Sequence, residues 1–310
     1  MKLQAENVRI SLNRMNNNFS GERTRFVILH GGAGNQLFQW AYAHFLHSLG
    51  HEVRCLFVNK KYLIQHASIC ISDFVEDCYE IKIEQIDVPK NILLGVLKDP
   101  THRKNPISLL TKNVSNNLKT PFEFNVISKL GKYNLGYYQN FEVVYLLREH
   151  LLSHLEKSLY NTIEPDINEA ALYGSQIIHV RQGDTMTLEN RRRVGVLNTS
   201  YYESLKIDKS SPVFVLTDDV KGAKNILGSL KVDGFYGPND LDVAATLRVM
   251  SKSSRLYCAN STLAWWGGVL AEKNGGEVYI PDPFFLNISP KPGVAFLYPG
   301  FRSMQSKFLG

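Results

Sequence analysis

Apolar and polar positions alternate along the chain in blocks that predict strands followed by helices. An apolar run at 25–30 leads through a glycine-rich turn into a stretch at about 36–49, where apolar residues recur at helical spacing. A second apolar run follows at about 52–58, and Gly50 stands where the helix should end. These segments predict a β-α-β unit.

The second half of the chain shows the same alternation more clearly. Its predicted strands are 175–180, 212–217, 232–236, 255–260 and 276–281, with helices predicted at about 201–207, 220–230, 242–253 and 263–272. Such alternation is typical of a parallel, doubly wound sheet, which binds ligands beyond the carboxyl ends of its strands.

Between these regions the pattern is weaker. Residues 60–135 contain short alternating runs and loop-like composition, and a helical run covers 141–159. We predict a boundary near 160–172. The predicted organisation is a polar leader (1–24), an N-terminal α/β domain (25–165), a C-terminal α/β domain (166–290) and a tail (291–310).

Composition narrows the class of partner. The 310 residues include 35 Lys and Arg against 29 Asp and Glu, giving a net charge of +6. The basic residues are spread out, which favours an anionic small molecule over nucleic acid. The cysteines show neither a C-x-x-C pair nor the spacing of a metal site, so we expect reduced, mostly buried thiols. Residues 1–24 lack the apolar core of a signal peptide, and with the reduced thiols this predicts a cytoplasmic protein. We expect no membrane-spanning run.

The glycine turn GGAGNQ, residues 31–36, allows two interpretations. Glycines at a strand-to-helix junction often only permit a tight turn. Alternatively, helix N-terminal amides attract an anion there, with Asn35 and Gln36 as side-chain donors beside Gly34. The spacing fits neither G-x-G-x-x-G nor a P-loop.

Two polar clusters follow predicted strands in the second half. In HVRQGD, Arg181 leaves a strand end and can bind phosphate oxygens as a planar fork, or it can simply pair with Asp184 on the surface. In LTDD, Thr217 or Asp218 can cap the next helix, or a carboxylate can hold a nucleobase edge or a ribose hydroxyl.

A third cluster is CANSTLAWWGG, where a strand becomes a helix. One of Asn260, Ser261 and Thr262 is expected at the N-cap, and hydroxyls plus helix amides suit a diphosphate. Trp265 and Trp266 are adjacent and cannot face the same way, so we expect one in the core and the other at an interface or a cleft.

The motifs GGAGNQLFQWAYA, GYYQN, HVRQGD, VLTDD and MSKSSRLYCANSTLAWWGGVLA occur in this order over most of residues 25–285. The ordered set resembles the alpha-1,2-fucosyltransferase family of inverting glycosyltransferases. The resemblance implies a GT-B-like architecture, in which two doubly wound α/β domains face each other across a cleft. It also implies that the C-terminal domain holds GDP-fucose, and that the enzyme needs neither a metal nor a cofactor.

The resemblance also implies roles for individual residues. Arg181 acts on the diphosphate and the glycosidic oxygen, with His179 beside it. The resemblance does not name the general base; Asp184, by its position, and His179 are the candidates. Together with the reading of the three polar clusters, this predicts that the donor is bound by Gly34, Asn35, Gln36, Arg181, Thr217, Asp218, Asn260, Ser261 and Thr262.

The chain departs from the family pattern at several positions. Gln182 stands where a second Arg is usual, Thr185 where Tyr is usual, and Thr246 where an acidic residue is usual, with Asp242 one turn earlier. The run at 191–193, three arginines, either restores the missing positive charge or is a solvated basic loop.

The predicted function is transfer of L-fucose from GDP-β-L-fucose to a sugar hydroxyl, O2 of a galactose in a glycan, with inversion to an α-fucoside. Two alternatives stay open: a transferase that uses another nucleotide sugar, and a catalytically silent binding protein. By resemblance the acceptor is a lipid-linked glycan, so we expect peripheral contact with the inner face of the cytoplasmic membrane and no nucleic-acid partner.

Overall fold

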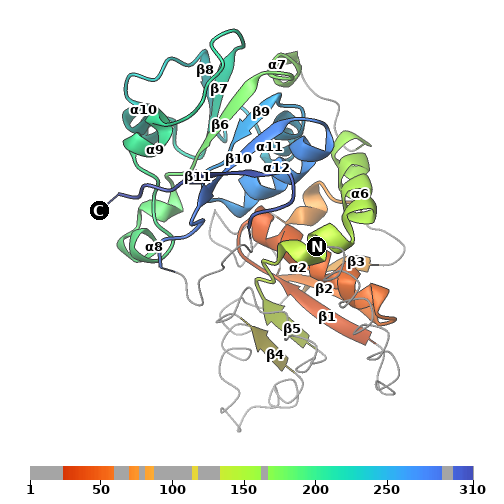
Figure 1. Ribbon diagram of the computed structural model, residues 1–310. Coiled ribbons are helices and arrows are strands. Elements are labelled where there is room, and N and C mark those ends of the chain that lie inside the picture. The colour runs from red at the N-terminus through yellow and green to blue at the C-terminus, as the bar shows by residue number, and fades with distance from the viewer. Residues whose placement is uncertain are drawn as a thin grey trace. The chain divides into compact units, whose positions relative to one another are not determined.

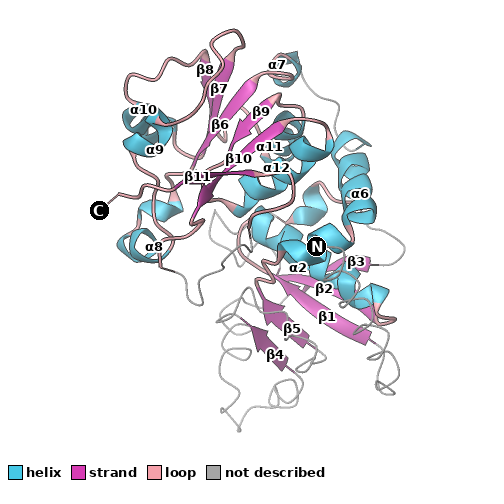
Figure 2. Cartoon of the chain, in the orientation of Figure 1, coloured by secondary structure: helices cyan, strands magenta, loops and turns pink. Residues whose placement is uncertain are grey.

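The computed structural model describes residues 24–58, 70–76, 81–86, 114–117, 133–161, 167–287 and 296–309. The chain divides into two compact units, Met1–Leu151 and Leu152–Gly310. Figures 1 and 2 show that each unit holds its own sheet with helices packed against it. The predicted α/β class is therefore confirmed. The expectation that the two units face each other across a cleft stays a prediction.

Unit 1 is built on a five-stranded parallel sheet in the order β3-β2-β1-β5-β4. The strands are β1 (Thr24–Leu29), β2 (Glu52–Val58), β3 (Ile81–Ile86), β4 (Val114–Asn117) and β5 (Tyr133–Gly136). Its other elements are α2 (Ala33–Ser48), the 3₁₀ turn η3 (Ile71–Asp73), α5 (Phe141–Leu146) and the start of α6 (Arg148–Asn161). The strand order reverses between β1 and β5.

The first β-α-β unit is confirmed, with small changes at its ends. Helix α2 begins at Ala33, three residues earlier than predicted, and the chain leaves it at Gly50, whose φ of +89° suits glycine. The Gly50 amide donates to the His47 carbonyl at 2.8 Å, which satisfies an end carbonyl of the helix. The long helix predicted over 141–159 is instead two helices, α5 and α6, separated at Leu147.

Unit 2 is built on a six-stranded parallel sheet in the order β11-β10-β9-β6-β7-β8. Its strands are β6 (Gln176–Val180), β7 (Val213–Thr217), β8 (Gly234–Tyr236), β9 (Arg255–Tyr257), β10 (Glu277–Asp282) and β11 (Arg302–Gln305). Its helical elements are α7 (Ile167–Ala170), η5 (Asp184–Met186), α8 (Leu188–Arg193), α9 (Thr199–Glu203), α10 (Val220–Leu227), α11 (Val243–Ser251) and α12 (Thr262–Lys273).

This order makes unit 2 a doubly wound sheet. From β6 the chain builds β7 and β8 on one side, then returns to build β9, β10 and β11 on the other, so the order reverses between β6 and β9. Ligands of such sheets bind beyond the carboxyl ends of the strands at this switch point. Strand β11, which lies in the segment predicted as a tail, pairs with β10 at the edge of the sheet.

The prediction for the tryptophan pair is wrong for a cleft. Trp265 and Trp266 have ring planes at 83° to each other, and both are 0% exposed, so neither lines an open cleft. The expectation that one of them lies at an interface stays a prediction. Helix α12 is enclosed on several sides, because α11 contacts one side of it and β10 another. A β-carbon at Gly267 would lie 2.7 Å from that of Met250, so glycine permits the close approach of α11.

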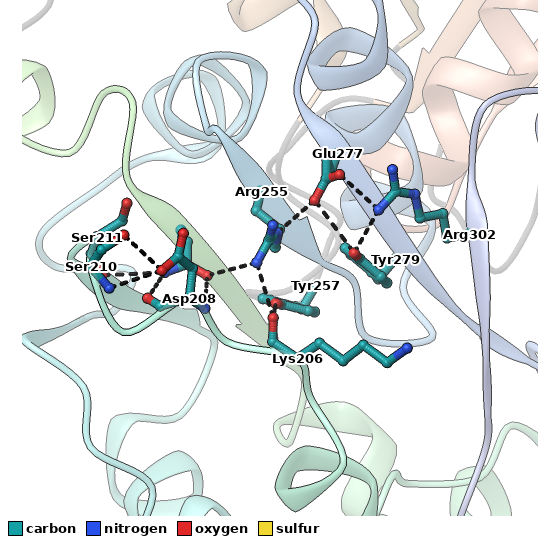
Figure 3. Close-up of polar contacts among 10 residues, drawn as sticks. Lys206, Asp208, Ser210, Ser211, Arg255, Tyr257, Glu277, Tyr279 and Arg302 are labelled. Atoms are coloured by element: carbon teal, nitrogen blue, oxygen red, sulfur yellow. Dashed lines mark hydrogen bonds and ion pairs between the residues drawn. The ribbon is translucent and has the colours of Figure 1, made fainter.

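Ion pairs join the amino ends of strands in unit 2 (Figure 3). Arg255 at the start of β9 and Arg302 at the start of β11 both bind Glu277 at the start of β10, each at 2.7 Å. Arg302 also donates to the Tyr279 hydroxyl, and Arg255 donates to the Lys206 carbonyl. These contacts tie the edge strand to the sheet at the end opposite the switch point.

Candidate active site

The carboxyl ends of β6 and β9 bring two predicted site residues together. Arg181 directly follows β6, and its Nη1 donates to the Ser261 Oγ at 3.3 Å. Ser261 lies between β9 and α12, at the N-cap of that helix. A guanidinium and a helix N-terminus at one switch point form a region of positive potential that suits an anion such as a diphosphate.

Ser261 occupies the N-cap without acting as a side-chain cap. Its backbone is extended, and its hydroxyl makes no hydrogen bond to an amide of the first turn of α12. The hydroxyl instead accepts from Arg181. Thr262 begins the helix and is buried. The prediction that one of these residues occupies the N-cap is thus confirmed for Ser261. Its hydroxyl, however, orients Arg181 and does not cap the helix.

His179 lies one strand position before Val180 and is 7% exposed. Burial is the main reason that its pKa falls to about 4. The positive charge of Arg181 also lowers the pKa, whereas the negative charge of Asp218 raises it. The imidazole is therefore neutral at pH 7. Its Nδ1 is a buried atom with no hydrogen-bond partner among the described residues. A neutral imidazole can accept or donate a single hydrogen bond at the site.

Asp218, directly after β7, is fixed by the loop that follows β6. The Gln182 backbone amide donates to its Oδ1 at 2.7 Å. A β-carbon at Gly183 would lie 2.7 Å from its Oδ2, so only glycine leaves room for the carboxylate in this position. The motifs HVRQGD and LTDD therefore meet through backbone contacts. Gly183 is a functional position that the motif contained but sequence reasoning did not single out.

The residue that caps α10 is Asp219, so the prediction of Thr217 or Asp218 is wrong. The Asp219 Oδ1 accepts from the Gly222 amide at 3.0 Å. The Thr217 hydroxyl accepts from the Asp219 amide at 3.1 Å and so supports the cap. Because Asp219 performs the capping, Asp218 is available to the site. The sequence LTDD does not indicate which of its two carboxylates points toward the helix.

Two other predicted residues take part in the framework of the site. Both amide contacts of Asn260 are with backbone carbonyls: its Nδ2 donates to Val194 at 3.2 Å and to Gly195 at 3.0 Å. Asn260 thus ties the segment after α8 to the end of β9. Asp184 belongs to η5, and its side chain lies outside the described residues. The donor role of Asn260 and the catalytic role of Asp184 stay predictions.

The switch point of unit 1 carries the glycine turn. Gly31 has a φ of +78°, which favours glycine. The Gln36 side chain is fully buried: its amide donates to the Gly31 carbonyl at 2.9 Å, and its Oε1 accepts from the Ile71 amide at 3.1 Å. Gln36 therefore holds the turn together, which is the structural interpretation of this residue.

Asn35 links the turn to the segment after β5. The Gln139 Nε2 donates to the Asn35 Oδ1 at 2.8 Å. Tyr138, beside Gln139, has a φ of +50°, an uncommon conformation for a residue with a bulky side chain. The motifs GGAGNQ and GYYQN thus meet within unit 1. Gly34 lies inside α2 and is buried. The donor roles of Gly34, Asn35 and Gln36 stay predictions.

Among the residues that the structure describes, no group of three or more His, Cys, Asp or Glu side chains is placed to hold a metal ion. Within the same residues, no helix combines the length and the apolar character needed to cross a membrane. Cys55, Cys70 and Cys258 are buried free thiols, while Cys78 lies outside the described residues.

Searches for related structures found glycosyltransferases with low similarity. Heptosyltransferase WaaC of E. coli matches with a TM-score of 0.39 and 8% identity, covering 83% of this chain and 88% of WaaC. A family 9 glycosyl transferase of Veillonella parvula matches with a TM-score of 0.44 and 9% identity, covering 91% of this chain and 86% of that one.

Sequence comparisons give a closer relationship. O-antigen biosynthesis glycosyltransferase WbnK of Escherichia coli is 25% identical over 293 residues, covering 84% of this chain and 94% of WbnK. An alpha-1,2-colitosyltransferase of Escherichia coli is 25% identical over 283 residues, covering 83% and 91%. The model of glycosyl transferase family 11 matches residues 25–284, a span that includes every motif at the two switch points. The chain therefore belongs to glycosyl transferase family 11 and is a glycosyltransferase.

Proposed function

We propose that this glycosyltransferase moves L-fucose from GDP-β-L-fucose to a sugar hydroxyl, O2 of a galactose in a glycan, with inversion to an α-fucoside. The observation that carries the proposal is the contact of Arg181 with Ser261 at the switch point of unit 2. A nucleotide diphosphate is the part of such a donor that needs a fixed cation and helix amides.

In the proposed reaction the acceptor oxygen attacks the anomeric carbon while the bond to the diphosphate oxygen breaks. The electron pair of that bond goes to GDP, so negative charge grows on the diphosphate. Arg181, the amides at the start of α12 and the hydroxyls of Ser261 and Thr262 stabilise that charge. The acceptor proton goes to a general base, for which Asp184 and His179 are the candidates.

Asp218 has a separate proposed role in donor recognition. Its Oδ1 accepts from the Gln182 amide, which fixes the carboxylate beside the strand ends. A carboxylate held in this way can accept hydrogen bonds from a nucleobase edge or from ribose hydroxyls. Asp218 would then select the nucleoside, while Arg181 acts on the diphosphate.

A second donor has specific support. The relative that is an alpha-1,2-colitosyltransferase has the same identity to this chain, 25%, as WbnK. Nucleotide-linked colitose is therefore the alternative donor. The phosphate-binding groups of unit 2 would serve either sugar, so the choice depends on the residues that surround the sugar.

The test is to incubate the protein with each nucleotide sugar, with and without a β-galactoside, and to measure release of the nucleotide. We expect release from GDP-fucose that the galactoside accelerates, and NMR of the product should show an α-1,2 linkage. Release from nucleotide-linked colitose alone would favour the second donor. Binding without release from any donor would favour the silent binding protein.

We further propose that the protein acts in the cytoplasm, at the inner face of the cytoplasmic membrane, on a lipid-linked glycan. The support for this location is the family to which the chain belongs and the relative WbnK, whose name assigns it to O-antigen biosynthesis. Fractionation of cells that express the full chain tests it. Recovery of most of the protein outside the cytoplasmic and inner-membrane fractions would contradict it.

A further inference from the structure

Two exposed apolar side chains flank the start of α8 in unit 2. Met186 is 42% exposed and Leu188 is 64% exposed, and they are the large hydrophobic side chains found exposed among the described residues of this unit. None of the residues of α8 is buried. Exposing such side chains to water is unfavourable, so a rigid surface that displays them is a candidate for contact with an apolar partner.

The segment is held firmly in place. The Met186 amide donates to the Gln182 carbonyl at 3.1 Å, which fixes the turn before α8. At the other end of the helix, the Asn287 amide donates to the Arg193 carbonyl, and its side chain donates to the Arg192 carbonyl, both at 2.9 Å. In Figure 1, α8 lies at the end of unit 2 opposite α7. The apolar side chains are therefore presented by an anchored element.

The same helix is strongly basic. Its sequence, LENRRR, carries three arginines against one glutamate, and the side chains of Arg192 and Arg193 are exposed. Exposed arginines next to exposed apolar side chains match the surface of an anionic bilayer, in which headgroup charge lies directly above hydrocarbon. Two isolated apolar side chains are too few for the core of a stable protein interface, which buries about 800 Å² per partner.

We propose that Met186, Leu188, Arg192 and Arg193 form a surface that docks unit 2 on an anionic lipid bilayer. The apolar pair enters the boundary between headgroups and acyl chains, and the arginines bind the headgroup phosphates. Because η5 and α8 follow Arg181 by only a few residues, docking places the proposed diphosphate site close to the membrane surface. The inference does not depend on which sugar is transferred.

The test is co-sedimentation of the full-length protein with phosphatidylcholine vesicles that contain either no anionic lipid or about 30% phosphatidylglycerol. We expect partitioning to the anionic vesicles that falls as salt is added. The double variant Arg192→Glu/Arg193→Glu should lower the partitioning to anionic vesicles by about tenfold or more. Met186→Ser/Leu188→Ser should lower this partitioning as well. The matched control Lys209→Glu/Lys231→Glu makes the same charge change at other exposed positions of unit 2 and should partition as the unaltered protein does.

A second readout locates the contact. Trp40, Trp265 and Trp266 are at most 1% exposed, so lipids brominated on the acyl chain should not quench them. Leu188→Trp should add emission that these lipids quench. The proposal is overturned if binding is equal on neutral and anionic vesicles, if the lysine control loses as much binding as the arginine variant, or if the new tryptophan is not quenched. Circular dichroism confirms that each variant is folded. No step of the test measures transferase activity, so its failure is distinct from failure of the proposed function.

Discussion

The Arg181 guanidinium donates to the Ser261 hydroxyl at 3.3 Å, and this bond joins the ends of β6 and β9, 80 residues apart in the sequence. These two strands flank the point where the strand order of unit 2 reverses. The Ser261 hydroxyl therefore holds the guanidinium at the place where doubly wound sheets bind nucleotides.

Replacing Ser261 with alanine should weaken GDP binding. The variant loses one hydroxyl near the proposed phosphate position and also the hydrogen bond that orients Arg181. We therefore expect the binding free energy of GDP to weaken by about 1 kcal/mol, which raises the Kd roughly fivefold. Stability should change little, because the hydroxyl makes no capping bond to α12. Calorimetric titration with GDP measures the effect. Ser253→Ala, a buried serine before β9, is the control, and equal GDP affinity in both variants would contradict a donor role for Ser261.

Gly183→Ala should impair donor binding by moving Asp218. The added β-carbon would lie 2.7 Å from the Asp218 Oδ2. Because this is closer than the two atoms can pack, the carboxylate has to move. We expect lower affinity for GDP and a loss of stability of about 1–3 kcal/mol. In the double variant Gly183→Ala/Asp218→Ala the stability loss should be less than the sum of the two single losses. Additive losses would show that the crowding does not involve Asp218.

Gly267→Ala should destabilise unit 2, although alanine is the better helix former by about 1 kcal/mol. The new β-carbon would lie 2.7 Å from that of Met250 and would force α11 and α12 apart. Crowding of a packed core costs about 1–3 kcal/mol, so the net effect should be a loss of stability. Urea unfolding measures it. Met250→Ala should partly rescue the variant, and a Gly267→Ala protein as stable as the original would disprove the close packing.

Burial of His179 should make stability depend on pH. Its pKa falls from an ordinary value of 6.5 to about 4 in the folded protein. As pH drops below about 6.5, the unfolded chain binds a proton that the folded chain does not, so stability falls until about pH 4 and then levels off. The loss at pH 5 relative to pH 7.5 should be about 2 kcal/mol. His179→Gln should lack this part of the loss. If urea unfolding gives both proteins the same change between these pH values, His179 is not buried as a neutral base.

Periodicity in the sequence was enough to predict most strands of unit 2 and the first β-α-β unit. It was not enough to predict β11, because a four-residue edge strand whose side chains are largely exposed has no apolar run. Helical spacing also failed to show that Trp265 and Trp266 are both buried, because α12 packs on more than one side. Its contacts come from α11 and β10, which are distant in the sequence.

The candidate site was predictable in its motifs but not in its contacts. HVRQGD, LTDD and CANST all lie at strand ends, as the alternation of elements indicated. Which carboxylate of LTDD caps α10 depends on the backbone conformation of Asp219, which the sequence does not show. The close approach of Gly183 to Asp218 depends likewise on how two loops meet. Such contacts between distant segments require coordinates.

The most direct test of the account is the kinetics of Arg181 variants with GDP-fucose, or with the donor that proves active. Charge grows on the diphosphate as the bond breaks, so loss of Arg181 should lower kcat more than it raises KM. Losing one hydrogen-bond donor that stabilises the transition state raises the activation free energy by about 2.7–4 kcal/mol, which lowers the rate by roughly 10² to 10³. Arg302→Ala, at the amino end of the edge strand β11 in the same sheet, is the control and should stay within about twofold of the original kcat.

The decisive variant is Arg181→Lys, which keeps the charge but lacks the planar fork. The measurement is kcat and KM for Arg181→Ala and Arg181→Lys, with thermal unfolding to confirm that both proteins fold. The account predicts that both variants lose at least about 10² in kcat while Arg302→Ala does not. Near-normal turnover by either folded Arg181 variant would contradict a role for Arg181 in stabilising the leaving diphosphate, and with it the placement of the donor site at the switch point of unit 2.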